Sequence, residues 1–293
     1  MLVRMGDIIK DKDFGLIVNG LDTLDPSKII ETICERRFIC FKNKTTVPPK
    51  ELVEFYKSVG KVHQQDEEFM SDEYVETYSE GFRELIPVRN KDISGYGENG
   101  LFAGDETGEI EWHCANQNRV YSEEITAFSI RQMGDTGGAL CISDNRSPYY
   151  EMPENLRFML DDIDVSYDSD DFAWSTPTSF NAKKFKNING EALPELQTDS
   201  KPLVLEHPID NVKGLHYSWP IIKAYHDYDE EEFQLIHKKI LDYILQDKYL
   251  YSHNWEVGDI ILNEQYHSLH RRDPYTGDRL LYRSAIYLNE EDR

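Results

Sequence analysis

The last part of the chain places two arginines where they would share one face of a strand. Arg279, Leu281 and Arg283 alternate within an apolar run, and alternate residues of an extended strand point to the same side of a sheet. Burying two guanidinium groups without an anion costs a large free energy. The pattern therefore predicts an anion-binding site, and the apolar residues of the run make the alternative, a solvated strand edge, less attractive.

Two of the nine histidines stand out by their context. His113 lies at the start of a region rich in strand-forming residues, and His270 follows the short apolar run 258–262. Taken alone, either histidine is more often a structural residue than a metal ligand. His267 lies three residues before His270, and we interpret it as a residue behind the site or at the surface.

The segments that would position these side chains include well-marked helices. Asp25, followed by proline, is a helix N-cap. A second helix begins at Pro49 and ends at Gly60. Asp229, with Glu232 three residues later, is a variant of the capping box and predicts a third.

Strands are predicted where apolar and β-branched residues cluster between turn residues. The predicted strands cover residues 37–41, 126–131, 139–142, 259–262 and 280–288, and a short helix is expected at 153–160. The order of elements predicts an α+β protein with a mainly β core, built around a sandwich or a barrel.

Three segments carry weaker signals. Residues 64–108 are polar and glycine-rich, which indicates loops with the role of a lid. The acidic run 161–171 indicates a solvated loop. We expect residues of about 150–250 to form a helical insert within a single domain that spans residues 1–293.

Composition limits the function. The chain has 293 residues and a formal charge of −23, which disfavours binding to nucleic acid. The four cysteines form no paired motif, and no apolar run is long enough to span a membrane. We therefore expect a cytoplasmic protein with reduced thiols and no membrane partner, one that could assemble as a homo-oligomer.

The segments described so far occur in an order that resembles the taurine dioxygenase-like (TauD/TfdA) branch of the Fe(II)/2-oxoglutarate-dependent oxygenases. The matching segments are Trp112-His113, Gly134-Asp135-Thr136, Pro202-Leu203-Val204, His207-Pro208, Gly258-Asp259-Ile260, His270 and the run from Arg279 to Arg283. No single segment is specific, but the ordered set covers nearly the whole chain. The resemblance implies a double-stranded β-helix (jelly roll) with flanking helices.

The resemblance also implies a site and its cofactors. His113 and His270 would bind Fe(II), and imidazoles suit that metal. Thr136 and Arg279 would hold the distal carboxylate of 2-oxoglutarate, with Arg283 near its other end. The reaction would consume O₂ and act on a small soluble molecule, for which an amino acid, a nucleotide or a carrier-bound group are all open.

One position departs from the family. The metal motif of these enzymes is His-x-Asp or His-x-Glu, whereas this chain has Ala115 two residues after His113. Radical halogenases within the superfamily resemble this sequence in having alanine or glycine there. A missing carboxylate opens one coordination position and removes one negative charge, and a chloride ion restores both. We therefore favour a radical halogenase with Ala115 as the halide vacancy and chloride as a further cofactor.

Two alternatives stay open. The first is a TauD-like hydroxylase or dioxygenase whose third ligand is water or comes from elsewhere, for example Glu111 or Asn116. The second is a non-catalytic relative that keeps the fold and binds a ligand. For the substrate, the residues around the metal motif offer Trp112, Asn116 and Asn118 as contacts, although an amide-rich loop is as often turn chemistry.

Overall fold

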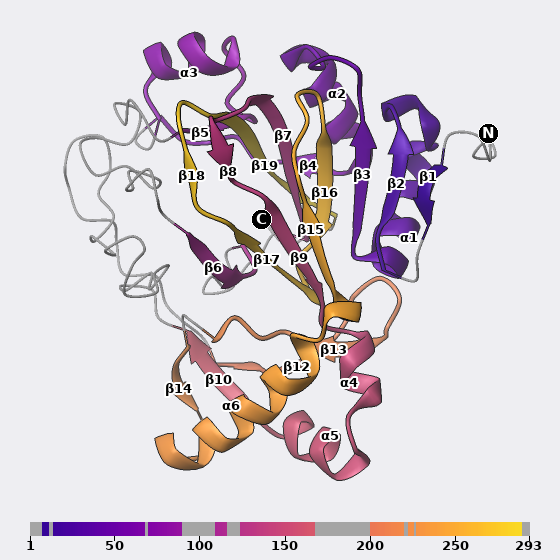
Figure 1. The fold of residues 1–293 in the computed structure, drawn as a ribbon, viewed down its shortest axis with the longest axis vertical. Coiled ribbons are helices and arrows are strands. Elements are labelled where there is room, and N and C mark those ends of the chain that lie inside the picture. Colours follow the sequence, from indigo (N-terminus) through magenta and orange to yellow (C-terminus); the bar gives the residue numbers. More distant parts are fainter. Residues whose placement is uncertain are drawn as a thin grey trace.

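The computed structural model describes the parts of the chain that position the predicted site (Figure 1). The described residues are 8–11, 14–67, 70–89, 109–115, 124–167, 200–219, 222–225 and 227–288. The helices are α1 (Pro26–Arg36), α2 (Pro49–Val59), α3 (Asp72–Ser79), α4 (Ser147–Glu151), α5 (Glu154–Asp161) and α6 (Glu230–Ile244), with 3-10 turns η2 (Leu21–Thr23) and η4 (Asp247–Tyr249). In this part of the chain, no helix is long and apolar enough to cross a membrane.

The larger sheet forms one wall of a jelly roll. Its strands, in spatial order, are β1 (Ile8–Asp11), β2 (Leu16–Asn19), β3 (Phe38–Lys42), β16 (Ile260–Glu264), β7 (Ile125–Gln132), β19 (Leu280–Tyr287) and β4 (Lys61–Val62), and β5 (Ile86–Val88) also pairs with β19. The β2–β3 pair is parallel and the other pairs are antiparallel. Strands from both ends of the sequence therefore meet in one sheet.

The smaller sheet faces it. Its strands are β15 (Leu250–His253), β9 (Leu140–Asp144), β17 (Ser268–Arg272) and β6 (Ile110–His113), in this order. At one end of the two sheets, β8 (Thr136–Gly137) pairs with β18 (Tyr275–Thr276) in a short separate ladder. The two walls agree with the predicted α+β jelly roll and its mainly β core.

Apolar side chains from both sheets fill the space between them. The buried members of this inner core are Ile17, Phe38, Cys40, Val88, Phe128, Ile130, Leu140, Ile142, Trp255, Ile261 and Leu281. Burying a side chain of this size contributes about 1.5–3 kcal/mol. Residues that share a face with these members therefore point into the jelly roll.

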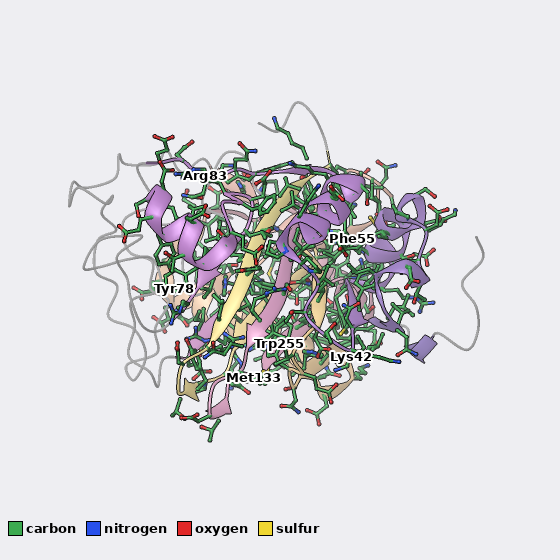
Figure 2. All side chains as sticks on the ribbon, turned by 90° about the horizontal axis from the view of Figure 1, so that it is seen from above. Lys42, Phe55, Tyr78, Arg83, Met133 and Trp255 are labelled. Atoms are coloured by element: carbon green, nitrogen blue, oxygen red, sulfur yellow. The ribbon has the colours of Figure 1, made fainter. Side chains whose placement is uncertain are left out.

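The first two helices cover the outer face of the larger sheet. Asp25 caps α1 through its side chain, which accepts a hydrogen bond from the Ser27 amide at 3.0 Å. On α2, Phe55 packs edge-on against Phe41 of β3, with ring centroids 5.4 Å apart. Figure 2, which views the molecule from above, labels Phe55 on this side. The predicted N-cap and both helices are confirmed.

The segment 150–250 has a core of its own. Besides α5 and α6 it contains β10 (Asp164–Tyr167), β11 (Ser200–Pro202), β12 (Val204–Glu206), β13 (Lys213–Leu215) and β14 (Ile222–Tyr225). Its buried cluster joins Phe233 and Ile240 of α6 to Val165 of β10 and Leu215 of β13. The predicted insert is therefore mixed helix and strand, and in Figure 1 it lies at the opposite end from α3.

Two loop predictions differ from the structure. The segment 64–108 contains α3 and β5 in its described part, since Tyr74 and Val75 of α3 have an apolar cluster to bury against. Residues 90–108 of the predicted lid region lie outside the described residues. The acidic run begins at the last residue of α5 and contains β10, in which Val165 and Tyr167 are fully buried. The alternate apolar residues of this segment form a strand in spite of the acidic residues between them.

Candidate active site

His113 and His270 face each other across neighbouring strands. They are directly opposed residues of β6 and β17, and their ring centroids are 4.1 Å apart. Directly opposed residues of an antiparallel pair lie on the same face of the sheet. The structure thus brings together two histidines that the sequence singled out separately.

This pair points into the jelly roll. On its other edge, β17 pairs His270 with Ile142 of β9, a member of the inner core. Phe128 of the larger sheet packs edge-on against the His270 ring, at 5.2 Å between centroids. Both histidines are therefore buried, at 8% exposure for His113 and 5% for His270.

Both imidazoles are held in the neutral form. Burial lowers the pKa of His113 to about 3, and the nearby charges of Arg283 and Arg272 add to the effect. Burial, followed by the charges of His113 and Arg283, lowers the pKa of His270 far below its usual range. A neutral imidazole is the form that coordinates a metal ion.

The hydrogen bonds of the two rings also fit a metal. The Nδ1–H of His113 donates to the carbonyl of Glu111 at 2.6 Å, which places the lone pair of the ring on Nε2. The Nδ1 of His270 is buried and has no hydrogen-bond partner among the described residues. Since an unsatisfied buried nitrogen is costly, a metal bound by this pair accounts for the arrangement.

Ala115 follows His113 by two residues, and its methyl side chain offers no metal ligand. It is 4% exposed, and its backbone N–H donates to the side chain of Gln265 at 2.8 Å. Within the described ranges, no group of three or more His, Cys, Asp or Glu side chains could hold a metal ion. Glu111 contacts the site through its carbonyl, and Asn116, the other alternative third ligand, lies outside the described residues.

Arg279 and Arg283 supply positive charge near the histidine pair. Arg279 is 3% exposed, and its Nε has no partner in the described part of the chain. Burial and the charge of Arg272 lower its pKa to about 10, so the guanidinium stays charged at neutral pH. Arg283 lies on β19 opposite Phe128 and lowers the pKa of both histidines. A buried charge for which the described residues supply no carboxylate, as at Arg279, calls for an anionic ligand.

Thr136 does not lie with Arg279 and Arg283 in the structure. It is exposed on the β8–β18 ladder, and its hydroxyl lies 2.8 Å from the hydroxyl of Thr276. The residue that does approach Arg279 is Gly138, where an added Cβ would lie 3.6 Å from the guanidinium Nε. The predicted role of Thr136 therefore has no geometric support, because the turn directs its side chain outward.

Trp112 points away from the histidines. It follows the alternation of β6 into a separate cluster with Cys114, Cys141 and Leu269. A substrate contact from this side chain is therefore not supported. Asn118, like Asn116, lies outside the described residues. His267 is fully buried and not a surface residue, with its Nδ1 accepting from Arg146 at 3.1 Å.

Sequence reasoning missed Arg272. It lies two residues after His270 on β17 and pairs with Leu140 of the inner core, so it shares the face of the metal ligand. Its guanidinium carbon lies 4.7 Å from the centre of the Tyr275 ring, and that of Arg279 lies 5.1 Å from the same centre. The signal that could have identified it is the two-residue spacing from His270.

Comparisons with known proteins match the chain to one family. The family model for "Taurine catabolism dioxygenase TauD, TfdA family" matches residues 12–285. A (S)-phenoxypropionate/alpha-ketoglutarate-dioxygenase from Sphingobium herbicidovorans is 22% identical over 181 residues, which span 61% of this chain and 62% of that relative's length.

Solved structures show the same fold. A taurine dioxygenase from Burkholderia xenovorans matches with a TM-score of 0.71 and 15% identity, over 98% of this chain and 93% of that one. AAD-2, crystallised with Mn(II) and N-oxalylglycine, matches with a TM-score of 0.72 and 17% identity, over 97% and 98%. At this identity the likeness extends to the fold alone.

Proposed function

This chain belongs to the TauD and TfdA family of Fe(II)- and 2-oxoglutarate-dependent dioxygenases, and from that premise we propose that it oxidises a C–H bond of a small molecule. The observation that carries the proposal is the pair of buried, neutral imidazoles of His113 and His270 beside a cluster of arginines. Bound iron, with 2-oxoglutarate and O₂, supplies the oxidising power for that step.

The neutral histidines and the charged arginines would bind different groups. His113 and His270 would hold the iron, and the hydrogen bond from His113 to the Glu111 carbonyl orients the first ring. Arg279 would hold the distal carboxylate of 2-oxoglutarate, since a buried guanidinium binds a carboxylate in a fixed geometry. Arg283, closer to the histidines, would neutralise the end of the cosubstrate that approaches the metal. The surrounding core excludes water from these charges.

The experiment uses the purified full chain under anaerobic conditions. Adding Fe(II) and then 2-oxoglutarate is expected to produce a visible charge-transfer band that saturates at one equivalent of each. Admitting O₂ with a panel of amino acids, nucleotides and aryloxy acids should then release succinate together with an oxidised product. Absence of both metal binding and the band would refute the proposal and leave the non-catalytic relative as the explanation.

Chlorination is the second candidate, and Ala115 favours it. The sequence alone ranks it first, but the relatives matched above are named as dioxygenases, so we now rank oxygenation ahead of it. At position 115 a methyl group takes the place of a carboxylate next to the histidine pair. Space and one missing negative charge would admit chloride. Product masses from reactions with chloride, with bromide and without halide distinguish the two reactions, because only chlorination gives a halide-dependent mass.

The charge of the whole chain bears on its partners. A formal charge of −23 disfavours a nucleic acid, which leaves a small soluble molecule as the proposed substrate. All four cysteines are free and buried, which suits a reducing compartment such as the cytoplasm.

A further inference from the structure

The backbone that follows the first metal ligand is held by a side chain from a distant part of the chain. The N–H of Ala115 donates to Oε1 of Gln265 at 2.8 Å. Gln265 is 1% exposed and lies just after β16, in the short connection that leads to β17 and His270. One side chain thus links residue 115 to the segment that precedes the second histidine.

The Gln265 amide has only one workable orientation. Its Nε2 donates to the carbonyl and to Oδ1 of Asn263, both at 3.0 Å, and approaches the carbonyl of Glu264 at 3.3 Å. Because these partners are acceptors, the amide nitrogen must face them and Oε1 must face Ala115. Asn263 is fixed in turn by the Ser268 hydroxyl, to which its Nδ2 donates at 2.7 Å.

A second side chain holds the preceding peptide. The N–H of Cys114 donates to the hydroxyl of Ser218 at 2.8 Å, and Ser218 is fully buried. Both peptide N–H groups after His113 are therefore bound by side chains from other segments. Two fixed peptide planes set the position of the Cα atom of residue 115 relative to the backbone of His113.

We propose that Gln265 is a positioning residue, which, assisted by Ser218, holds residue 115 where a carboxylate on that residue would reach the metal. This inference rests on the proposed function, since it assumes that His113 and His270 bind the metal. With alanine at position 115, the hydrogen bonds to Gln265 and Ser218 keep the backbone from closing over the unfilled coordination position. The site then accepts a small exogenous ligand, water or a halide, in place of a side chain.

The test measures how far a carboxylate at position 115 tightens metal binding in two backgrounds. Ala115→Asp is made in the natural chain and in Gln265→Leu, and the affinity for Co(II) is measured anaerobically by absorption titration. In the natural background we expect the aspartate to tighten Co(II) binding by about 10- to 100-fold and to change the d–d spectrum of the ion. Loss of a partner that orients a ligand typically costs about the same factor, so Gln265→Leu should remove most of that gain.

Matched variants separate positioning from general damage. Gln246→Leu removes a partly exposed glutamine, whose Nε2 donates to the Asp242 carbonyl, and should leave the full gain intact. If Gln265→Leu does not fold, Ser218→Ala removes only a hydroxyl and should reduce the gain in part. An equal gain from Ala115→Asp with and without Gln265, or with and without Ser218, would overturn the inference while leaving the metal site standing. Failure of the parent and of Ala115→Asp to bind Co(II) at all would overturn the proposed function, and the inference with it.

Discussion

The imidazole rings of His113 and His270 lie 4.1 Å apart because β6 and β17, distant in the sequence, are neighbours in the smaller sheet. Each ring is buried and neutral, and the second has a buried Nδ1 that no described residue satisfies. Two buried imidazoles in contact stabilise a fold poorly on their own. Their arrangement is the strongest structural argument that the chain binds a metal.

Removing the second imidazole should abolish metal binding. For His270→Ala we expect the affinity for Fe(II) or Co(II) to fall by more than about 100-fold, since the loss of a ligand exceeds the 10- to 100-fold effect of a partner behind one. Anaerobic titration measures the affinity. His237→Ala, on α6, is the control, because that ring bonds to the Tyr217 hydroxyl in the core of the insert. Equal affinities for parent and His270→Ala would show that the metal, if any, binds elsewhere.

We expect Arg279 to contribute to the affinity for 2-oxoglutarate, and Arg271, which lies on the outer face of β17, to contribute nothing. Arg279→Gln is expected to weaken 2-oxoglutarate binding by about 10- to 100-fold, the factor that corresponds to a hydrogen-bonded charge of 1.5–3 kcal/mol. Arg271 points outward to Glu109 and Asp273, at 3.1 and 2.8 Å, so Arg271→Gln is the matched control. The measurement is the 2-oxoglutarate dependence of the charge-transfer band. If Arg271→Gln weakened 2-oxoglutarate binding more than Arg279→Gln, the cosubstrate would bind on the outer face of β17 and the assignment to Arg279 would be wrong.

A carboxylate at position 115 should exclude chloride. If the chain chlorinates its substrate, Ala115→Asp should lower the chlorinated product at least about tenfold, because two negative charges about 4 Å apart repel by a few kcal/mol at the effective dielectric of a protein. Ala115→Gly keeps the space and should keep the reaction. Product masses measured in the presence of chloride report both. Undiminished chlorination by Ala115→Asp would disprove the vacancy.

Stability should fall in acid because several histidines are buried in the neutral form. Burial lowers the pKa of His216 to about 3, while its Nδ1 contacts the Tyr266 carbonyl at 3.1 Å. The stability that this residue contributes is complete above pH 6.5 and is lost as the pH falls toward 3, since the unfolded chain binds the proton and the folded chain does not. Between pH 6 and 4, His216→Asn should reduce the slope of the unfolding free energy by about 1.4 kcal/mol per pH unit. Denaturant titrations at several pH values give the slope, and parallel slopes for parent and variant would contradict the prediction.

A buried acid works in the opposite direction. Burial raises the pKa of Glu264 to about 7, against the opposing effect of Arg37. The folded chain therefore holds a proton that the unfolded chain releases above about pH 4.5, and stability should decline as the pH rises from there through 7. Glu264→Gln should remove this decline in denaturant titrations. A steeper decline in the variant would show that Glu264 is ionised in the fold.

Local patterns predicted most of the elements. Asp25 at the start of α1 and the Asp229–Glu232 capping box of α6 are both present, because caps depend on residues within one turn. Strands β7, β16 and β19 were predicted within a few residues for the same reason, since alternation and turns are local. Strand β10 was missed because its neighbours are acidic, and only pairing with β11 and β14 shows why Val165 is buried.

Residues of the candidate site were predicted unevenly. Arg279 and Arg283 were predicted from the spacing of a single strand. The two-residue spacing from His270 could have identified Arg272 in the same way, and the pairing of β17 with β9 shows that it points inward. Thr136 was assigned to the distal carboxylate of 2-oxoglutarate from a short motif, but in the β8–β18 ladder its side chain points outward. No local pattern singled out Gln265, because its role depends on a hydrogen bond from Ala115, which is 150 residues away in the chain.

The sequence by itself determined the helix caps, the apolar faces of the strands and the chemical types of the groups available: imidazole, guanidinium, and a methyl group at position 115. These depend on contacts within a few residues. Only the tertiary structure decided that His113 opposes His270 and that Gln265 holds Ala115. Strand pairing joins residues far apart in the chain, and its register depends on the burial of the whole jelly roll, which no local pattern contains.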